Sequence, residues 1–154
     1  MPVRKPKQPR GLAGALVVDC SVVFAWYFAD EANAYADAVA KDLSSTKAVV
    51  PTIWPLEVAN TLVMGERRKR STELQATAFL SRLARLPITI DDQTTIRAWS
   101  STLQFARRHQ LSAYDAAYLE LAHRLRANLA TLDEPLKSAA RSAGVAIYQP
   151  RAKA

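Results

Sequence analysis

The chain has 154 residues, of which 49% are hydrophobic and 23% are charged, proportions typical of one globular domain that folds without cross-links. Its single cysteine, Cys20, excludes an internal disulfide and suits the reducing cytoplasm, and its apolar runs are too short to span a membrane. The net charge of +7, from 21 Lys and Arg against 14 Asp and Glu, favours a polyanionic partner such as nucleic acid.

The first residues differ in composition from the rest. Residues 1–13 carry four basic side chains and three prolines, and they lack the apolar stretch of a secretory signal. We expect them to form a basic, flexible arm. Residues 14–150 contain no repeat and no long linker, so we expect them to form one domain.

Apolar runs and helix-capping residues alternate along this domain. Short apolar runs predict buried strands at residues 15–19, 47–51, 87–90, 128–131 and 145–148. Helices are predicted between and after them, at residues 21–28, 31–43, 52–67, 71–85, 91–109, 112–126 and 133–144. Six of these helices begin at expected capping residues, in chain order Ser21, Thr52, Ser71 or Thr72, Asp91, Ser112 and Asp133, and Gly144 suits the position after the last one. The alternation predicts a single-domain, three-layer α/β/α sandwich with a parallel sheet of four to five strands.

Two acidic residues follow strands of this predicted sheet. Asp19 ends the first strand, and Asp133 comes two residues after the fourth. The carboxyl ends of parallel strands form one edge, which is where ligands bind in open α/β sheets. We therefore expect both side chains at the same edge.

Local structure can explain each of four acids separately. Asp19 and Asp133 can accept hydrogen bonds at the N-termini of the helices that follow them, and Asp115 fits a capping box with Ser112. Glu57 could be an ordinary solvated residue, although it borders the apolar stripe of its helix. None of these explanations requires the four to share one edge. If they do share it, their charges repel, and a divalent cation bound through oxygen is the usual resolution.

The chain resembles the PIN-domain ribonucleases, specifically the VapC toxins of bacterial toxin–antitoxin pairs. The resemblance runs over about residues 15–148 and is carried by four segments in the family's order and spacing: VVDCSVVFAWYFADE (17–31), VPTIWPLEVANTL (50–62), LSAYDAAYLELA (111–122) and LATLDEPLKSAARSAGV (129–145). One departure is Cys20, at a position where a small residue such as Ala or Thr is expected. Because cysteine is small and behaves as a buried apolar residue, this departure puts little in doubt.

The resemblance implies an active site and a reaction. The family's acidic quartet falls on Asp19, Glu57, Asp115 and Asp133, and its supporting polar positions fall on Ser21, Asn60 and Thr131. The implied activity is a ribonuclease that leaves 5′-phosphate and 3′-hydroxyl ends. Asp19, Asp115 and Asp133 would bind Mg²⁺, with Mn²⁺ as a substitute, and Glu57 would bind or position water.

The resemblance also implies partners. These are an RNA substrate, a VapB-type antitoxin that covers the acidic site, and a second copy of the chain in a homodimer. We expect no membrane partner. Candidates for RNA contact are the basic run of Arg67, Arg68, Lys69 and Arg70 and the two tyrosines Tyr114 and Tyr118. The ordinary reading of the basic run is a solvated helix end.

One other function remains open, and a second is disfavoured by the sequence. A non-catalytic PIN-like module that binds RNA or protein would share the fold, and metal-dependent RNA turnover separates it from a nuclease. An aspartyl-nucleophile enzyme wants a second acid two residues after the first, where this chain has Ser21.

Overall fold

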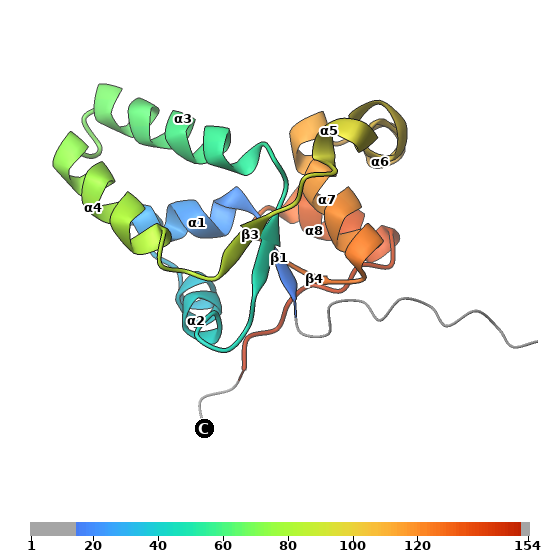
Figure 1. The fold of residues 1–154 in the computed structure, drawn as a ribbon, viewed down its shortest axis with the longest axis horizontal. Helices are drawn as coiled ribbons and strands as arrows, with labels where there is room; N and C mark the ends of the chain where they lie inside the picture. The colour runs from blue at the N-terminus through green and yellow to red at the C-terminus, as the bar shows by residue number, and fades with distance from the viewer. Residues whose placement is uncertain (1–14, 152–154) are drawn as a thin grey trace, which may run out of the picture.

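The computed structural model describes residues 15–151, so the basic arm expected over residues 1–13 lies outside the described residues. At its centre is a parallel sheet with strand order β3-β2-β1-β4 (Figure 1). The strands are three residues each: β1 (Leu16–Val18), β2 (Ala48–Val50), β3 (Ile88–Ile90) and β4 (Asn128–Ala130). Leu16 pairs with Ala48 on one side and Asn128 on the other, which sets the register of the central strand. The first four predicted strands are confirmed, each somewhat shorter than expected.

The fifth predicted strand, 145–148, is reduced to one bridge. Ile147 pairs with Leu129 in a parallel sense, through bonds from the Leu129 N–H to the Ala146 carbonyl (2.9 Å) and from the Tyr148 N–H to the Leu129 carbonyl (2.8 Å).

Helices cover the sheet on both sides. Figure 1 shows α1 to α4 on one side and α5 to α8 on the other. Their bounds are α1 (Cys20–Tyr27), α2 (Ala34–Asp42), α3 (Trp54–Arg67), α4 (Glu73–Leu83), α5 (Thr94–Arg97), α6 (Leu103–His109), α7 (Ala113–Leu125) and α8 (Glu134–Ser142), with a 3₁₀ turn η1 (Ala29–Glu31) and a π turn η2 (Ala98–Thr102). This arrangement confirms the three-layer α/β/α sandwich. None of the helices within residues 15–151 is long and apolar enough to cross a bilayer.

Four expected helix starts are wrong, three of them in the first half of the chain. Asp19, and not Ser21, caps α1. The helix expected at residue 31 begins at Ala34, because the Asn33 side chain accepts from the backbone N–H groups of Tyr35 and Ala36. Thr52 does not cap α3, since its hydroxyl donates to the Asp91 carbonyl (2.8 Å).

The long helix expected from residue 91 to 109 is divided into α5, η2 and α6. Asp91 is not its cap, because α5 begins only at Thr94, with Gln93 in the cap position. The Asp91 carboxylate accepts from the Gln93 N–H (3.1 Å) and also binds the guanidinium of Arg124 on α7 at 3.2 and 2.7 Å. Buried Glu120, also on α7, lies 3.5 Å from both Arg97 and Ser101, so the π turn is held at two points. The starts at Thr72, Ser112 and Asp133 are confirmed, and so is the position of Gly144 after α8, with φ +74°.

The Arg124 cluster gives a stability prediction. The Arg124 side chain is 17% exposed and binds Asp91 (11% exposed) and Glu120 (4% exposed). Removing it leaves two carboxylates out of water without their main partner, so Arg124→Ala should lower the free energy of unfolding by about 3–5 kcal/mol. Urea unfolding measures this. Lys137→Ala, which breaks the pair with largely exposed Glu134, is the control and should cost at most about 1 kcal/mol. Equal losses in the two variants would contradict the prediction.

Candidate active site

Asp19 is a buried carboxylate at the carboxyl end of the central strand. Its N–H donates to the Ala130 carbonyl of β4 (2.9 Å), which places it beside the neighbouring strand. The residue is 5% exposed. Its Oδ2 accepts from the hydroxyls of Ser21 (2.6 Å) and Thr131 (2.8 Å) and, more distantly, from the Ser21 N–H (3.4 Å). All three bonds go to Oδ2, and none of them involves Oδ1.

Ser21 and Thr131 tie the ends of β1 and β4 together. The Ser21 hydroxyl accepts from the Leu132 N–H (2.9 Å), and the Thr131 hydroxyl accepts from the Asp133 N–H (3.0 Å). The same two hydroxyls hold Asp19, so one small network fixes the segment that carries Asp133 relative to Asp19. Asn60, the third expected supporting residue, is exposed on α3 and lines a separate hollow of about 350 Å³ with Arg68.

Glu57 lies in the first turn of α3 and is partly buried. The Tyr118 hydroxyl donates to its Oε1 at 2.8 Å. Burial raises the pKa of Glu57, the Tyr118 bond opposes that rise, and the negative charges of Asp19 and Asp115 add to it. Glu57 is therefore close enough to both aspartates to be repelled by them.

Asp115 and Asp133 complete the group. Asp115 is in the first turn of α7, where its N–H donates to the Ser112 hydroxyl (3.1 Å). Burial raises the pKa of Asp115, and the charge of Asp133 raises it further. The pKa of Asp19 is also raised, by burial first and by Asp115 to a smaller extent. Repulsion thus links all four carboxylates, of which Glu57 and Asp115 lie in α3 and α7 and Asp19 and Asp133 cap α1 and α8.

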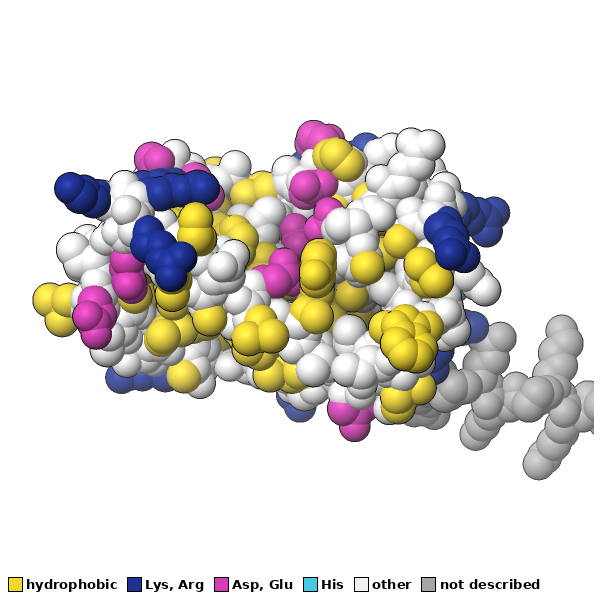
Figure 2. Space-filling model, turned by 90° about the horizontal axis from the view of Figure 1, so that it is seen from above, with side chains coloured by type: hydrophobic (Ala, Val, Ile, Leu, Met, Phe, Trp, Pro, Cys, Tyr) yellow, Lys and Arg dark blue, Asp and Glu magenta, His cyan; other side chains and the backbone are white. Residues whose placement is uncertain are grey.

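The surface shows the same arrangement. In Figure 2 acidic side chains form a band across the middle of one face, between the half that carries α3 and α4 and the half that carries α5 and α6. Lys and Arg side chains lie towards both ends of that face. A negative cleft between positive flanks suits a polyanion that must approach a cation.

The chemistry of the site suits a hard divalent ion, because all its donors are carboxylate oxygens. Within residues 15–151, however, no three Asp, Glu, His or Cys side chains stand close enough to hold an ion in their present positions. Three of the four have raised pKa values, and a cation among them would relieve that strain. The fit is therefore one of donor type and charge.

Tyr118 is not available to RNA, contrary to the sequence-based expectation. Its side chain is fully buried, and its hydroxyl lies 3.1 Å from the Cys20 sulfur as well as bonding Glu57. Burial raises the pKa of both Tyr118 and Cys20, so both keep their protons at neutral pH. The spacing of three residues indicates that Asp115 and Tyr118 lie on the same face of one helix. It does not indicate that the Tyr118 side chain is buried.

The other candidates for RNA contact differ in accessibility. Tyr114, beside Asp115, is 63% exposed. Arg67, Arg68 and Lys69 are exposed at the end of α3. Arg70 is engaged by Asp30 (3.0 Å) and Glu31 (2.9 Å), and its guanidinium lies 3.8 Å from the centre of the Phe28 ring.

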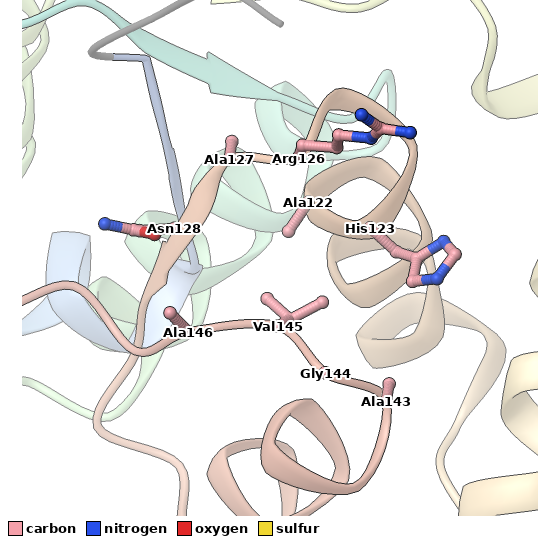
Figure 3. A pocket seen from close by; sticks show the side chains of 9 residues that line it. All are labelled: Ala122, His123, Arg126, Ala127, Asn128, Ala143, Gly144, Val145 and Ala146. Carbon is pink, nitrogen blue, oxygen red and sulfur yellow. The ribbon is translucent and has the colours of Figure 1, made fainter.

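A hollow of about 540 Å³ lies at the other end of the strands, beside the C-terminal ends of α7 and α8 (Figure 3). Ala122, Ala127 and Val145 form its apolar wall. The imidazole of His123 and the guanidinium of Arg126, at the end of α7, extend outwards. Since none of its nine lining side chains is a carboxylate, hydroxyl or thiol, it offers no alternative centre for hydrolysis.

The model of the PIN domain family matches residues 16–142. The chain belongs to the PIN domain family. It is 28% identical over 121 residues to a protein named Ribonuclease VapC3 from Pyrobaculum aerophilum, covering 79% of this chain and 91% of that one.

Solved structures share the fold, each with a TM-score of 0.60. PAE2754 from Pyrobaculum aerophilum is 20% identical, over 84% of this chain and 87% of that one. FitAcB from Neisseria gonorrhoeae is 16% identical (88% and 97%). VapBC2 from Rickettsia felis, solved with a DNA fragment from their promoter, is 14% identical (87% and 97%). At these identities the likeness shows that the PIN fold is common to all of them.

The raised pKa of Asp115 predicts how the metal-free protein responds to pH. A carboxyl whose pKa is higher in the folded state stabilises the fold most at low pH, and that contribution is lost as pH rises through the folded pKa. Asp115→Asn should therefore raise the melting temperature at pH 7, and the gain should shrink as pH falls towards the ordinary value of 3.8. Thermal unfolding in EDTA measures this. Asp37→Asn, at an exposed position on α2, is the control and should show no such gain, and a gain of equal size there would count against the prediction.

Proposed function

We propose that this PIN domain is a VapC-type endoribonuclease toxin. It acts in the cytoplasm, depends on Mg²⁺ or Mn²⁺, and leaves 5′-phosphate and 3′-hydroxyl ends. The observation that carries the proposal is the buried Asp19 carboxylate, fixed by Ser21 and Thr131 and repelled by a neighbouring acid that is itself coupled to the others. Family membership and the named ribonuclease among the relatives support it.

Each member of the site has a proposed role. Asp19, Asp115 and Asp133 hold the metal, and Glu57 binds it or orients the attacking water. A bound divalent ion would lower the pKa of that water and offset the negative charge that develops on the phosphate. Ser21 and Thr131 keep one oxygen of Asp19 occupied and so fix the direction of the other. Water attacks in line with the leaving 3′ oxygen, so no histidine and no 2′-hydroxyl nucleophile is needed.

Loss of one acid tests the site directly. Asp19→Asn keeps an oxygen that can accept from Ser21 and Thr131, so the fold should survive. Cleavage should fall at least about a hundredfold in this variant and in Asp115→Asn, because a proposed ligand of the catalytic metal is lost. Quantified cleavage of a labelled RNA in Mg²⁺ measures the effect. Full activity in either variant, or undiminished cleavage in excess EDTA, would contradict the proposed metal site. Failure of the wild type to cleave RNA in Mg²⁺ or Mn²⁺ would favour a non-catalytic PIN-like module.

Metal binding can be measured without activity. An ion at a hundred times its dissociation constant should raise the free energy of unfolding by about 2.7 kcal/mol. Mg²⁺ or Mn²⁺ should therefore raise the melting temperature of the wild type and raise that of Asp19→Asn much less. Equal shifts in the two proteins would place the ion elsewhere.

We also propose that the basic run Arg67, Arg68 and Lys69 and the exposed ring of Tyr114 contact RNA. Arg70 is excluded from this role by its acidic partners. In an Asp115→Asn background, which prevents cleavage, changing the three basic residues to Gln should weaken RNA binding. The slope of log K against log salt should become shallower by roughly 0.7 for each lost phosphate contact. Fluorescence anisotropy at several salt concentrations measures both effects, with exposed Arg141→Gln on α8 as the control. An unchanged slope would dismiss the contact.

The proposed protein partners are a VapB-type antitoxin that covers the acidic cleft and a second copy of the chain. Static light scattering of the purified chain decides the homodimer. An antitoxin over the cleft follows from the proposed toxin role. The cell that makes this nuclease depends on its own RNA, so it must hold the nuclease inactive.

A further inference from the structure

Tyr118 occupies an unusual position for a buried aromatic residue. It is the largest of the side chains that are fully buried, yet its hydroxyl reaches the edge of the acidic cleft. The hydroxyl oxygen is 2.8 Å from Oε1 of Glu57 and 3.1 Å from Sγ of Cys20. The three residues lie on α7, α3 and α1, so this short chain of contacts joins three helices that surround the cleft.

The direction of both hydrogen bonds follows from the number of protons. A phenol has one proton, and an ionised carboxylate can only accept. Tyr118 therefore donates its proton to Glu57. The contact with Cys20 then requires the thiol to donate to the tyrosine oxygen, and the chain runs from Cys20 through Tyr118 to Glu57.

Glu57 needs such a donor to stay in the cleft. It has three side-chain torsions, is only partly buried, and is repelled by Asp19 and Asp115. Without a donor, rotation towards solvent would reduce both the repulsion and the loss of hydration. Tyr118, by contrast, has two torsions and is fixed by the packing around it. A bond from a rigid donor to a charged acceptor is among the stronger hydrogen bonds in proteins.

We propose that Tyr118 is a positioning residue that holds the Glu57 carboxylate against the other acids of the cleft, with the Cys20 thiol orienting the tyrosine hydroxyl. This rests on the proposed nuclease function. The alternative is that Tyr118 only fills the core, in which case its hydroxyl matters for stability and not for cleavage.

A double-mutant cycle with Tyr118→Phe and Glu57→Gln separates these readings. Tyr118→Phe keeps the ring and removes only the hydroxyl. We expect its kcat for RNA cleavage to fall about ten- to a hundredfold, with KM within about twofold of the wild type, because a misplaced catalytic group costs rate and not binding. Adding Tyr118→Phe to Glu57→Gln should cause little further loss, because the tyrosine acts through the glutamate. A wild-type kcat in Tyr118→Phe, or losses that multiply in the double variant, would overturn the proposal.

Tyr35→Phe is the matched control. Its hydroxyl also donates a 2.8 Å hydrogen bond inside the fold, to the Tyr148 carbonyl, and neither residue belongs to the acidic group. It should lose stability and keep its kcat. Cys20→Ala removes only the thiol and leaves Glu57 its donor, so its loss of kcat should be smaller than that of Tyr118→Phe, and an equal or larger loss would overturn the proposed order of the chain.

A second cycle, with Tyr118→Phe and Glu57→Ala, is measured by urea unfolding of the metal-free protein and needs no activity. Alanine removes the acceptor, whereas Gln would keep an amide oxygen that can accept from the Tyr118 hydroxyl. The effects of Tyr118→Phe and Glu57→Ala on stability should be non-additive, because each removes the same bond. Additive effects would overturn the inference even in an active nuclease. A wild type that cleaves no RNA in Mg²⁺ or Mn²⁺ would instead refute the proposed function, while the unfolding cycle would still decide whether Tyr118 holds Glu57.

Discussion

Repulsion among the four carboxylates is the constraint on which the rest of the site depends. Asp19 is nearly inaccessible to water, and burial raises its pKa. A charge in that position is tolerated only with fixed donors or a cation nearby. The Ser21 and Thr131 hydroxyls supply the donors, and they satisfy one oxygen. The donors thus compensate the charge of Asp19 only in part, and the proposed cation would supply the remaining compensation.

Hydrogen bonds that begin two of the helices also hold two of these acids in place. The bonds that cap α1 and α8 are made by Asp19 and Asp133, so the residues that begin the helices also define the site. The explanation of each acid by local structure and its proposed role in the site are therefore compatible. In Asp19 the oxygen that caps α1 is Oδ2, so the capping bonds leave Oδ1 for the proposed role.

Sequence patterns predicted the features that depend on neighbouring residues. Apolar runs marked the four strands, and Thr72, Ser112 and Asp133 begin helices as expected because their capping bonds span only three residues. Thr52 and Asp91 were misassigned because their partners, the Asp91 carbonyl and Arg124, lie 39 and 33 residues away. Tyr118 was misjudged for the same reason, since its partners Cys20 and Glu57 are 98 and 61 residues distant. The roles proposed for the four acids rest on the resemblance and on their electrostatic coupling.

The shortness of the strands has a consequence for how this protein can change. Three residues in a strand span roughly 10 Å, so Asp19 is separated from the far end of the sheet by only Leu16, Val17 and Val18, all fully buried. No other residue of the strand separates these packed side chains from the acidic edge. A substitution that shifts Val18 shifts the backbone of Asp19 with it. Sequence change in the centre of the sheet is therefore coupled to the acidic edge, and variation is easier to accommodate on the outer helices.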